Sequence, residues 1–197
     1  MRVITHIVLH TAASARNGQP VHQSIEDIRR YHVNHNMWTD IGYHYYLTED
    51  GKVHEGRDPA IAGAHVGGFN KHTLGVCVSG HGDLGPWNES QVKGVVELCA
   101  YLCRSHNLRA GRVIGHNECG DANGYDGPPI YKTCPGKLVD MSDIRKRVNE
   151  ALQDKQELTL EERVSALEWR TADLERRFGS ISSTSLPIDP KDWKVTC

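Results

Sequence analysis

The sequence predicts an α/β protein with a mixed central sheet flanked by helices, followed by a C-terminal helix that bears heptads. Apolar runs of strand length occur at residues 3–9, 74–79 and 112–115, and such runs are typical of buried strands. A pattern of helical periodicity covers residues 88–103. Strands that are interleaved with helices along the chain indicate this class.

The N-terminal half contains one helix start and one hairpin signal. Ser24 stands three residues before Asp27, at the head of a segment with apolar residues at helical spacing. This pairing resembles a capping box, so a helix is expected to begin here. Farther along, residues 43–48 and 52–55 flank Glu49-Asp50-Gly51. Acidic residues followed by glycine between two strand-like runs predict a β-hairpin.

The second half of the chain contains the signals of two further helices. Asn88 with Gln91 three residues later predicts the cap of a second helix, and a third helix is expected to start near Ser142. A loop rich in glycine and proline lies between, at residues 120–129. The apolar stripe of the second helix consists of Val92, Val95, Val96, Cys99, Leu102 and Cys103.

Composition excludes several classes of protein. The chain has 197 residues, a net charge of −2 and a pI of about 6.6, so a broad nucleic-acid surface is not expected. It lacks an apolar run long enough for a membrane span. We also expect no signal peptide, because the first residues lead directly into strand-like sequence. The six cysteines are then expected to stay reduced.

Three segments are expected: a main domain at residues 1–152, a helical segment at 153–178 and a flexible tail at 179–197. The helical segment predicts a homo-oligomeric coiled coil through residues 158–178. Docking of this helix on the domain and a solvated helix remain alternatives. Its heptad positions are Leu160, Val164, Leu167, Thr171, Leu174 and Phe178.

Two histidines and one cysteine suggest a metal site. His10 and His116 each stand at the end of a strand-like run, and Cys134 lies in a loop. Two imidazoles and a thiolate suit zinc, and three protein ligands leave a fourth position for water, which is typical of a catalytic site. Lys132, two residues before the cysteine, adds a cation where an oxyanion can form. This combination predicts a hydrolase.

Short motifs along residues 1–150 resemble, in order, zinc-dependent N-acetylmuramoyl-L-alanine amidases. The likeness is to phage amidase-type lysozymes and peptidoglycan recognition proteins. The matching segments are Val8-Leu9-His10-Thr11, Gly42-Tyr43-His44, Asp50-Gly51, Glu55-Gly56-Arg57, Gly63-Ala64-His65, Gly75-Val76, Gly115-His116-Asn117-Glu118 and Lys132-Thr133-Cys134-Pro135.

This resemblance implies a role for each residue of the predicted site. It implies that Zn²⁺ is the cofactor, and that Tyr43 and Lys132 assist catalysis. A tyrosine hydroxyl can orient water or relay a proton, and a cation can stabilise charge on a carbonyl oxygen. His65 is expected to line the substrate groove. The implied zinc ligands are His10, His116 and Cys134.

Three nearby residues have more than one interpretation. Glu118 is expected to be a structural neighbour of the site rather than the general base. Arg57 is expected to form structural ion pairs, with a substrate contact as the alternative. Cys119 is close enough in sequence to the predicted site to compete as a ligand, although we expect that it does not.

The resemblance implies hydrolysis of the amide between N-acetylmuramic acid and L-alanine in bacterial peptidoglycan. It fits a bacteriolytic endolysin of a phage or prophage, which accumulates in the host cytoplasm before lysis and then acts on the cell wall. One alternative is a non-catalytic peptidoglycan-binding module, although such modules typically lack the cysteine or the tyrosine. An intracellular amidase that recycles muropeptides is another, although it would favour aspartate in place of Cys134. A regulatory protein that binds a polymerase, as some phage amidases do, is a third.

Overall fold

A five-stranded mixed sheet forms the centre of the computed structural model, which describes residues 2–154. Strand β4 forms an antiparallel hairpin with β5, and the pairs β4–β6, β6–β1 and β1–β7 are parallel. The expected mixed sheet is therefore confirmed. In spatial order the strands are β5 (Val53–Glu55), β4 (Tyr45–Leu47), β6 (Thr73–Val78), β1 (His6–Thr11) and β7 (Val113–Gly115).

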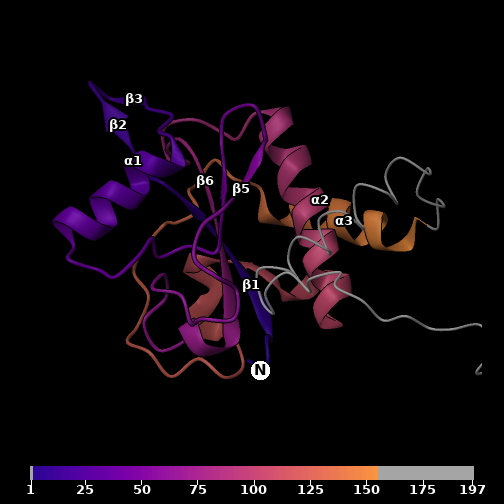
Figure 1. Cartoon of the computed structure of the whole chain (residues 1–197). Coiled ribbons are helices and arrows are strands. Elements are labelled where there is room, and N and C mark those ends of the chain that lie inside the picture. The colour runs from indigo at the N-terminus through magenta and orange to yellow at the C-terminus, as the bar shows by residue number, and fades with distance from the viewer. Residues whose placement is uncertain (1, 155–197) are drawn as a thin grey trace, which may run out of the picture. The chain divides into compact units, whose positions relative to one another are not determined.

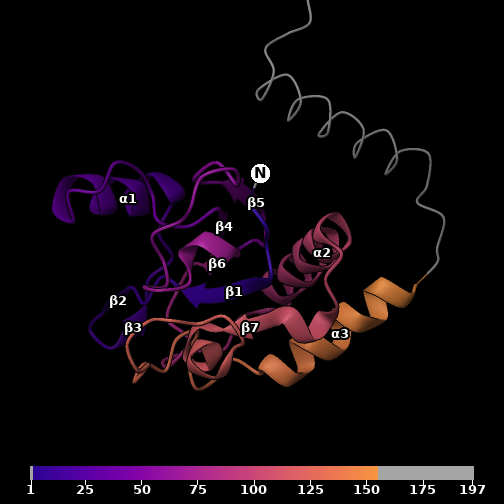
Figure 2. The ribbon, with the colours of Figure 1, turned by 90° about the horizontal axis from the view of Figure 1, so that it is seen from below.

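Helices cover both faces of this sheet. Helices α2 (Glu89–His106) and α3 (Met141–Gln153) pack against each other on one face, whereas α1 (Ile25–Arg30) lies on the other (Figures 1 and 2). The hairpin of β2 (Ala15–Arg16) and β3 (Gln19–Pro20) follows β1. The sheet is thus the middle layer of three, as the interleaved sequence pattern predicts.

Alternation along β1 assigns its side chains to two different environments. Ile7 and Leu9 belong to the main core, together with apolar residues of β6, α2 and α3. Val8 points to the opposite face, where a smaller cluster forms with Val66 and Phe69 of the loop before β6. His10 shares this second face because side chains two residues apart in a strand lie on the same side. The site described below therefore lies opposite α2 and α3.

The expected helix caps are present. Ser24 accepts a hydrogen bond from the Asp27 backbone N–H, and the Asp27 carboxylate accepts one from Ser24 N in return. Asn88 and Gln91 form the same reciprocal pair at the start of α2. Both capping boxes satisfy donors that the first turn of a helix leaves unpaired.

Two local features differ from the expectations. Strand β1 runs from His6 to Thr11 rather than from Val3 to Leu9, so His10 lies within the strand. The turn around Asn17-Gly18 joins two short strands that sequence patterning does not predict. Both turn residues have positive φ, 51° and 74°, which suits the tight turns that join antiparallel strands.

The structure describes one compact unit that ends at Asp154. The heptad helix and the tail expected over residues 153–178 and 179–197 lie, except for residues 153 and 154, outside the described residues, as does the coiled-coil interface at 158–178. Among the helices of residues 2–154, none has the length and apolar character that crossing a membrane requires.

Candidate metal centre and active site

Three potential metal ligands converge at the carboxyl-terminal edge of the sheet. His10 lies in β1, His116 directly follows β7, and Cys134 lies in the loop before α3. Because β1 and β7 are parallel, with Leu9 opposite Gly115, the next residue of each strand reaches the same edge. One ligand atom from each of the three residues lies within 4.8 Å of the others. The structure therefore brings together the three residues that the sequence singled out.

The separation of the donor atoms fits a zinc ion. Cys134 Sγ lies 3.7 Å from His10 Nδ1. Bond lengths of about 2.3 Å for sulfur and about 2.1 Å for nitrogen place two tetrahedral ligand atoms about 3.6 Å apart. Imidazole nitrogen and thiolate sulfur are also the donors that zinc prefers. The residues present therefore fit the metal that the resemblance implies.

Electrostatics keep both imidazoles in the form that can bind a metal. Burial lowers the pKa of His10 well below its usual value, and nearby imidazoles and the Lys132 cation lower it further. Burial and the same cation lower the pKa of His116 to about 4. Burial raises the pKa of the Cys134 thiol to about 11. The metal-free cysteine thus keeps its proton at neutral pH, and a bound cation must displace it.

Backbone and side-chain hydrogen bonds fix the loop that carries Cys134. The Cys134 carbonyl accepts a hydrogen bond of 2.8 Å from Asn117 N, next to His116. On the other side, the Asp83 carboxylate accepts bonds from the Thr133 hydroxyl at 2.6 Å and from Lys137 N at 2.7 Å. Sequence reasoning missed Asp83, because no local pattern links it to a loop so far along the chain.

Tyr43 lies beside the first ligand. The centroids of its ring and the His10 imidazole are 5.1 Å apart, and those of its ring and the His32 imidazole are 5.5 Å apart. Burial raises the pKa of Tyr43 well above its usual value. Its hydroxyl therefore keeps its proton at neutral pH and can act as a hydrogen-bond donor.

Lys132 is exposed in the loop that also carries Cys134. Its charge acts on the site, because it contributes to lowering the pKa values of both His10 and His116. The structure thus places an exposed cation near the two histidines that are predicted to bind the metal.

His65 is adjacent to the predicted metal ligand His10 and does not line the pocket next to Tyr43. Its Nδ1 lies 3.0 Å from Nε2 of His10, and its ring packs edge-on against that of His10 with centroids 5.1 Å apart. The expected substrate contact of His65 remains a prediction.

The three ambiguous neighbours have structural partners. The Glu118 carboxylate accepts a bond from Gly115 N and pairs with both terminal nitrogens of Arg145. Arg57 donates to three backbone carbonyls rather than to a carboxylate. Cys119 is buried, and its thiol contacts the Gly115 carbonyl rather than the ligand cluster. Glu118 thus has the structural partners expected of it, whereas Arg57 binds backbone carbonyls in place of the expected ion pairs.

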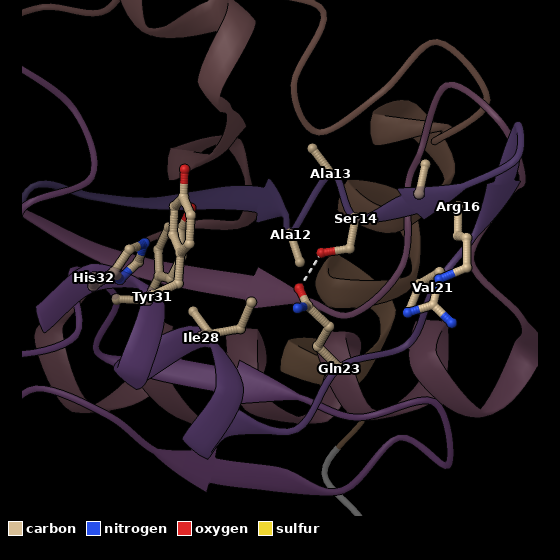
Figure 3. Close-up of a pocket in the computed structure, with 11 residues that line it drawn as sticks. Ala12, Ala13, Ser14, Arg16, Val21, Gln23, Ile28, Tyr31 and His32 are labelled. Carbon is tan, nitrogen blue, oxygen red and sulfur yellow. Dashed lines mark hydrogen bonds between the residues drawn. The ribbon is translucent and has the colours of Figure 1, made fainter. Parts of the chain in front are cut away.

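A pocket of about 540 Å³ lies next to Tyr43. It runs between the end of β1, the β2–β3 hairpin and α1, and Figure 3 shows Ser14 and Gln23 pointing toward each other across it. A hydrogen bond joins these two side chains. The sequence patterns did not predict this pocket. The residues that line the pocket include Ala12, Arg16, Ile28, Tyr31 and His32.

Solved structures share this architecture. The N-acetylmuramoyl-L-alanine amidase LysC from Clostridium intestinale URNW matches 75% of this chain and 87% of its own, with a TM-score of 0.63 and 22% identity. The Drosophila peptidoglycan recognition protein SD matches 71% of this chain and 78% of its own, with a TM-score of 0.55 and 20% identity. The fold is therefore one that peptidoglycan amidases and recognition proteins have in common.

Sequence comparison identifies the family. The family model described as N-acetylmuramoyl-L-alanine amidase matches residues 1–137, and the chain belongs to this family. The endolysin of Enterobacteria phage T3 is 33% identical over 126 residues, which cover 60% of this chain and 82% of that protein. Peptidoglycan-recognition protein SD of Drosophila melanogaster is 28% identical over 114 residues, or 57% of this chain. This second match spans 61% of the relative's own length.

Proposed function

We propose that this protein is a zinc-dependent amidase that hydrolyses the bond between the lactyl group of N-acetylmuramic acid and L-alanine in peptidoglycan. The observation that supports this most strongly is the convergence of His10, His116 and Cys134 within 4.8 Å, in a chain of the amidase family. Bound by two neutral imidazoles and one thiolate, a zinc ion would leave the site with a net charge of +1 and would act as a Lewis acid that polarises the amide and lowers the pKa of water to about 7.

The chain's own residues contribute hydrogen bonds and charge. The buried Tyr43 hydroxyl, which retains its proton, can donate to the amide oxygen as negative charge develops on it. The Lys132 ammonium can stabilise the same charge or protonate the leaving amine. In the overall reaction water adds across the C–N bond, which yields a lactyl carboxylate and a free alanine amino group.

The pocket beside Tyr43 offers room for the groups that flank the scissile amide. Its wall combines polar side chains with apolar ones such as Ile28 and Val21, a mixture that suits a peptide joined to a sugar. Tyr31 is 53% exposed at the border of this pocket, and an exposed aromatic ring can pack against the apolar face of a sugar.

The biological role that we propose is that of a phage or prophage endolysin. The phage T3 relative bears that name. Such a protein is made in the host cytoplasm and reaches peptidoglycan after the membrane is permeabilised. A peptidoglycan-binding module without turnover is the second candidate, because the chain is also similar to a recognition protein. The presence of both Tyr43 and Cys134 favours the enzyme.

Digestion of purified peptidoglycan distinguishes these functions. The products are analysed by mass spectrometry after incubation with the protein, with a chelator, and with a chelator followed by added zinc. We expect new L-alanine amino termini that disappear on chelation and return with zinc. New reducing sugar ends would assign a different bond. Binding to peptidoglycan without soluble products would instead favour the recognition module. Cys134→Ser serves as the inactive control.

A further inference from the structure

His65 occupies a slot on the sheet that two glycines create. A methyl group on Gly75 would approach the His65 ring to within 2.6 Å, and one on Gly63 would approach its Cδ2 to within 2.5 Å. Because any larger residue at either position would collide with the ring, the backbone of β6 and the preceding loop together shape the space that the imidazole fills. The ring therefore lies directly beside His10.

The backbone of this loop is held equally firmly. The Asn70 side-chain oxygen accepts hydrogen bonds from His65 N and Val66 N, each 2.9 Å long. The Arg2 guanidinium in turn donates to the carbonyls of Asn70 and Thr73, each at 2.7 Å. These contacts leave His65 little freedom to move away from the metal ligand that it touches.

The hydrogen bonds that join Thr73, His65 and His10 can be donated in one direction only. The Thr73 hydroxyl donates its single proton to the Phe69 carbonyl at 2.8 Å. Toward His65 Nε2, 3.4 Å away, that hydroxyl can therefore only accept. His65 then carries its proton on Nε2, which leaves Nδ1 as the acceptor for the Nε2–H of His10.

This direction leaves the lone pair of His10 where a metal can use it. With its proton on Nε2, His10 presents a bare Nδ1 toward Cys134 Sγ, 3.7 Å away. The opposite tautomer would direct an N–H at the metal position and prevent ligation. The geometry points to His65 as the positioning residue that sets the tautomer and orientation of His10. This inference rests on the zinc site proposed above. Mutation of a residue that hydrogen-bonds to a metal-bound histidine typically lowers metal affinity by about 10–100-fold.

Nuclear magnetic resonance on the metal-free protein tests the tautomer directly. Long-range ¹H–¹⁵N spectra distinguish a protonated Nδ1 from a protonated Nε2. We expect His10 of the wild-type protein to carry its proton on Nε2 before zinc is added. A proton on Nδ1 would overturn the inference whether or not the protein binds zinc. In His65→Leu we expect this preference to be lost, because the side chain no longer accepts a hydrogen bond.

Zinc affinity, measured by competition with a chromophoric chelator, provides the second test. We expect His65→Leu to bind zinc about 10–100-fold more weakly than the wild type. His65→Asn should recover most of the loss, because its amide oxygen can replace Nδ1 as the acceptor. His54→Leu, in β5 and away from the cluster, should match the wild type.

The outcomes separate the two proposals. If the wild type binds zinc and His65→Leu binds it equally well, the positioning role is wrong while the metal site stands. If the wild type binds no zinc, the proposed function fails, and the tautomer of metal-free His10 still decides the inference. If His65→Leu does not fold, the zinc affinity of His65→Asn is the test. A wild-type affinity in His65→Asn supports the role of residue 65 as a hydrogen-bond acceptor. A loss of affinity as large as about 100-fold would contradict that role.

Discussion

The carboxylate of Asp83 binds the hydroxyl of Thr133 at 2.6 Å, directly beside the predicted metal ligand Cys134. The same carboxylate accepts a bond of 2.7 Å from Lys137 N. Asp83 therefore bridges the two ends of the short segment that carries the cysteine. We predict that Asp83→Ala weakens zinc binding about tenfold, because the sulfur is no longer held at the distance that the two imidazoles require.

A second aspartate provides a matched control for this prediction. Asp50 also accepts a bond from a threonine hydroxyl, Thr48 at 2.6 Å, and one from a backbone N–H, that of Lys52. It lies in the β4–β5 turn, away from the ligand cluster. Asp50→Ala should lower thermal stability without changing zinc affinity. Equal zinc affinities for the two variants, measured by chelator competition, would contradict the role assigned to Asp83.

Removal of the Tyr43 hydroxyl should separate catalysis from metal binding. In Tyr43→Phe we expect kcat to fall about 10²–10³-fold, because one donor to the developing charge is lost. Zinc content should remain unchanged, because the proposed ligands are His10, His116 and Cys134. Tyr46→Phe is the control, since that hydroxyl donates to the Gln23 carbonyl instead. A Tyr43→Phe enzyme with wild-type kcat on peptidoglycan would exclude the hydroxyl from catalysis.

The charge of Lys132 should matter more than the length of its side chain. We predict that Lys132→Met lowers kcat about 10–100-fold and that Lys132→Arg retains part of the activity. Lys137→Met, in the same loop and also exposed, tests whether any loss of positive charge near the site is enough. Similar losses in Lys132→Met and Lys137→Met would indicate a general electrostatic effect rather than a specific contact.

Stability of the metal-free protein should depend on pH. The pKa values of His44 and His116 are lowered to about 4, mainly by burial, whereas an unfolded histidine titrates near pH 6.5. Between these values the unfolded state binds more protons, so the free energy of unfolding falls as the pH falls from about 6.5 to about 4. Urea titrations with a chelator present measure this slope. A shallower slope is expected for His44→Asn, and a free energy of unfolding that rises on acidification would contradict the account.

Much of the fold could be predicted because local patterns and global structure agree. The capping boxes at Ser24 and Asn88 and the hairpin around Gly51 each depend on residues close together in sequence. The places of His10 and His116 at the ends of strand-like runs could also be read from sequence, whereas the parallel pairing that brings them together is seen only in the structure. Short-range signals such as caps and hairpin turns can be recognised without any knowledge of tertiary packing.

The remaining features depend on contacts between distant segments. His65 reaches His10 only because Gly75, in a different strand, leaves space for its ring. Asp83 gains its role from a loop that folds back over it. The pocket forms between the β2–β3 hairpin and α1, and the hairpin itself has strands of two residues each, too short for a periodic pattern. Such relationships arise only when the chain is folded.

The central claim is that two imidazoles and one thiolate hold a catalytic zinc ion. Zinc K-edge X-ray absorption on protein loaded with one equivalent of the metal measures these ligands directly. We expect one sulfur at about 2.3 Å and three nitrogen or oxygen neighbours at about 2.0–2.1 Å, with the sulfur contribution lost in Cys134→Ser. A zinc ion with no sulfur neighbour, or one whose sulfur persists in Cys134→Ser, would contradict the account.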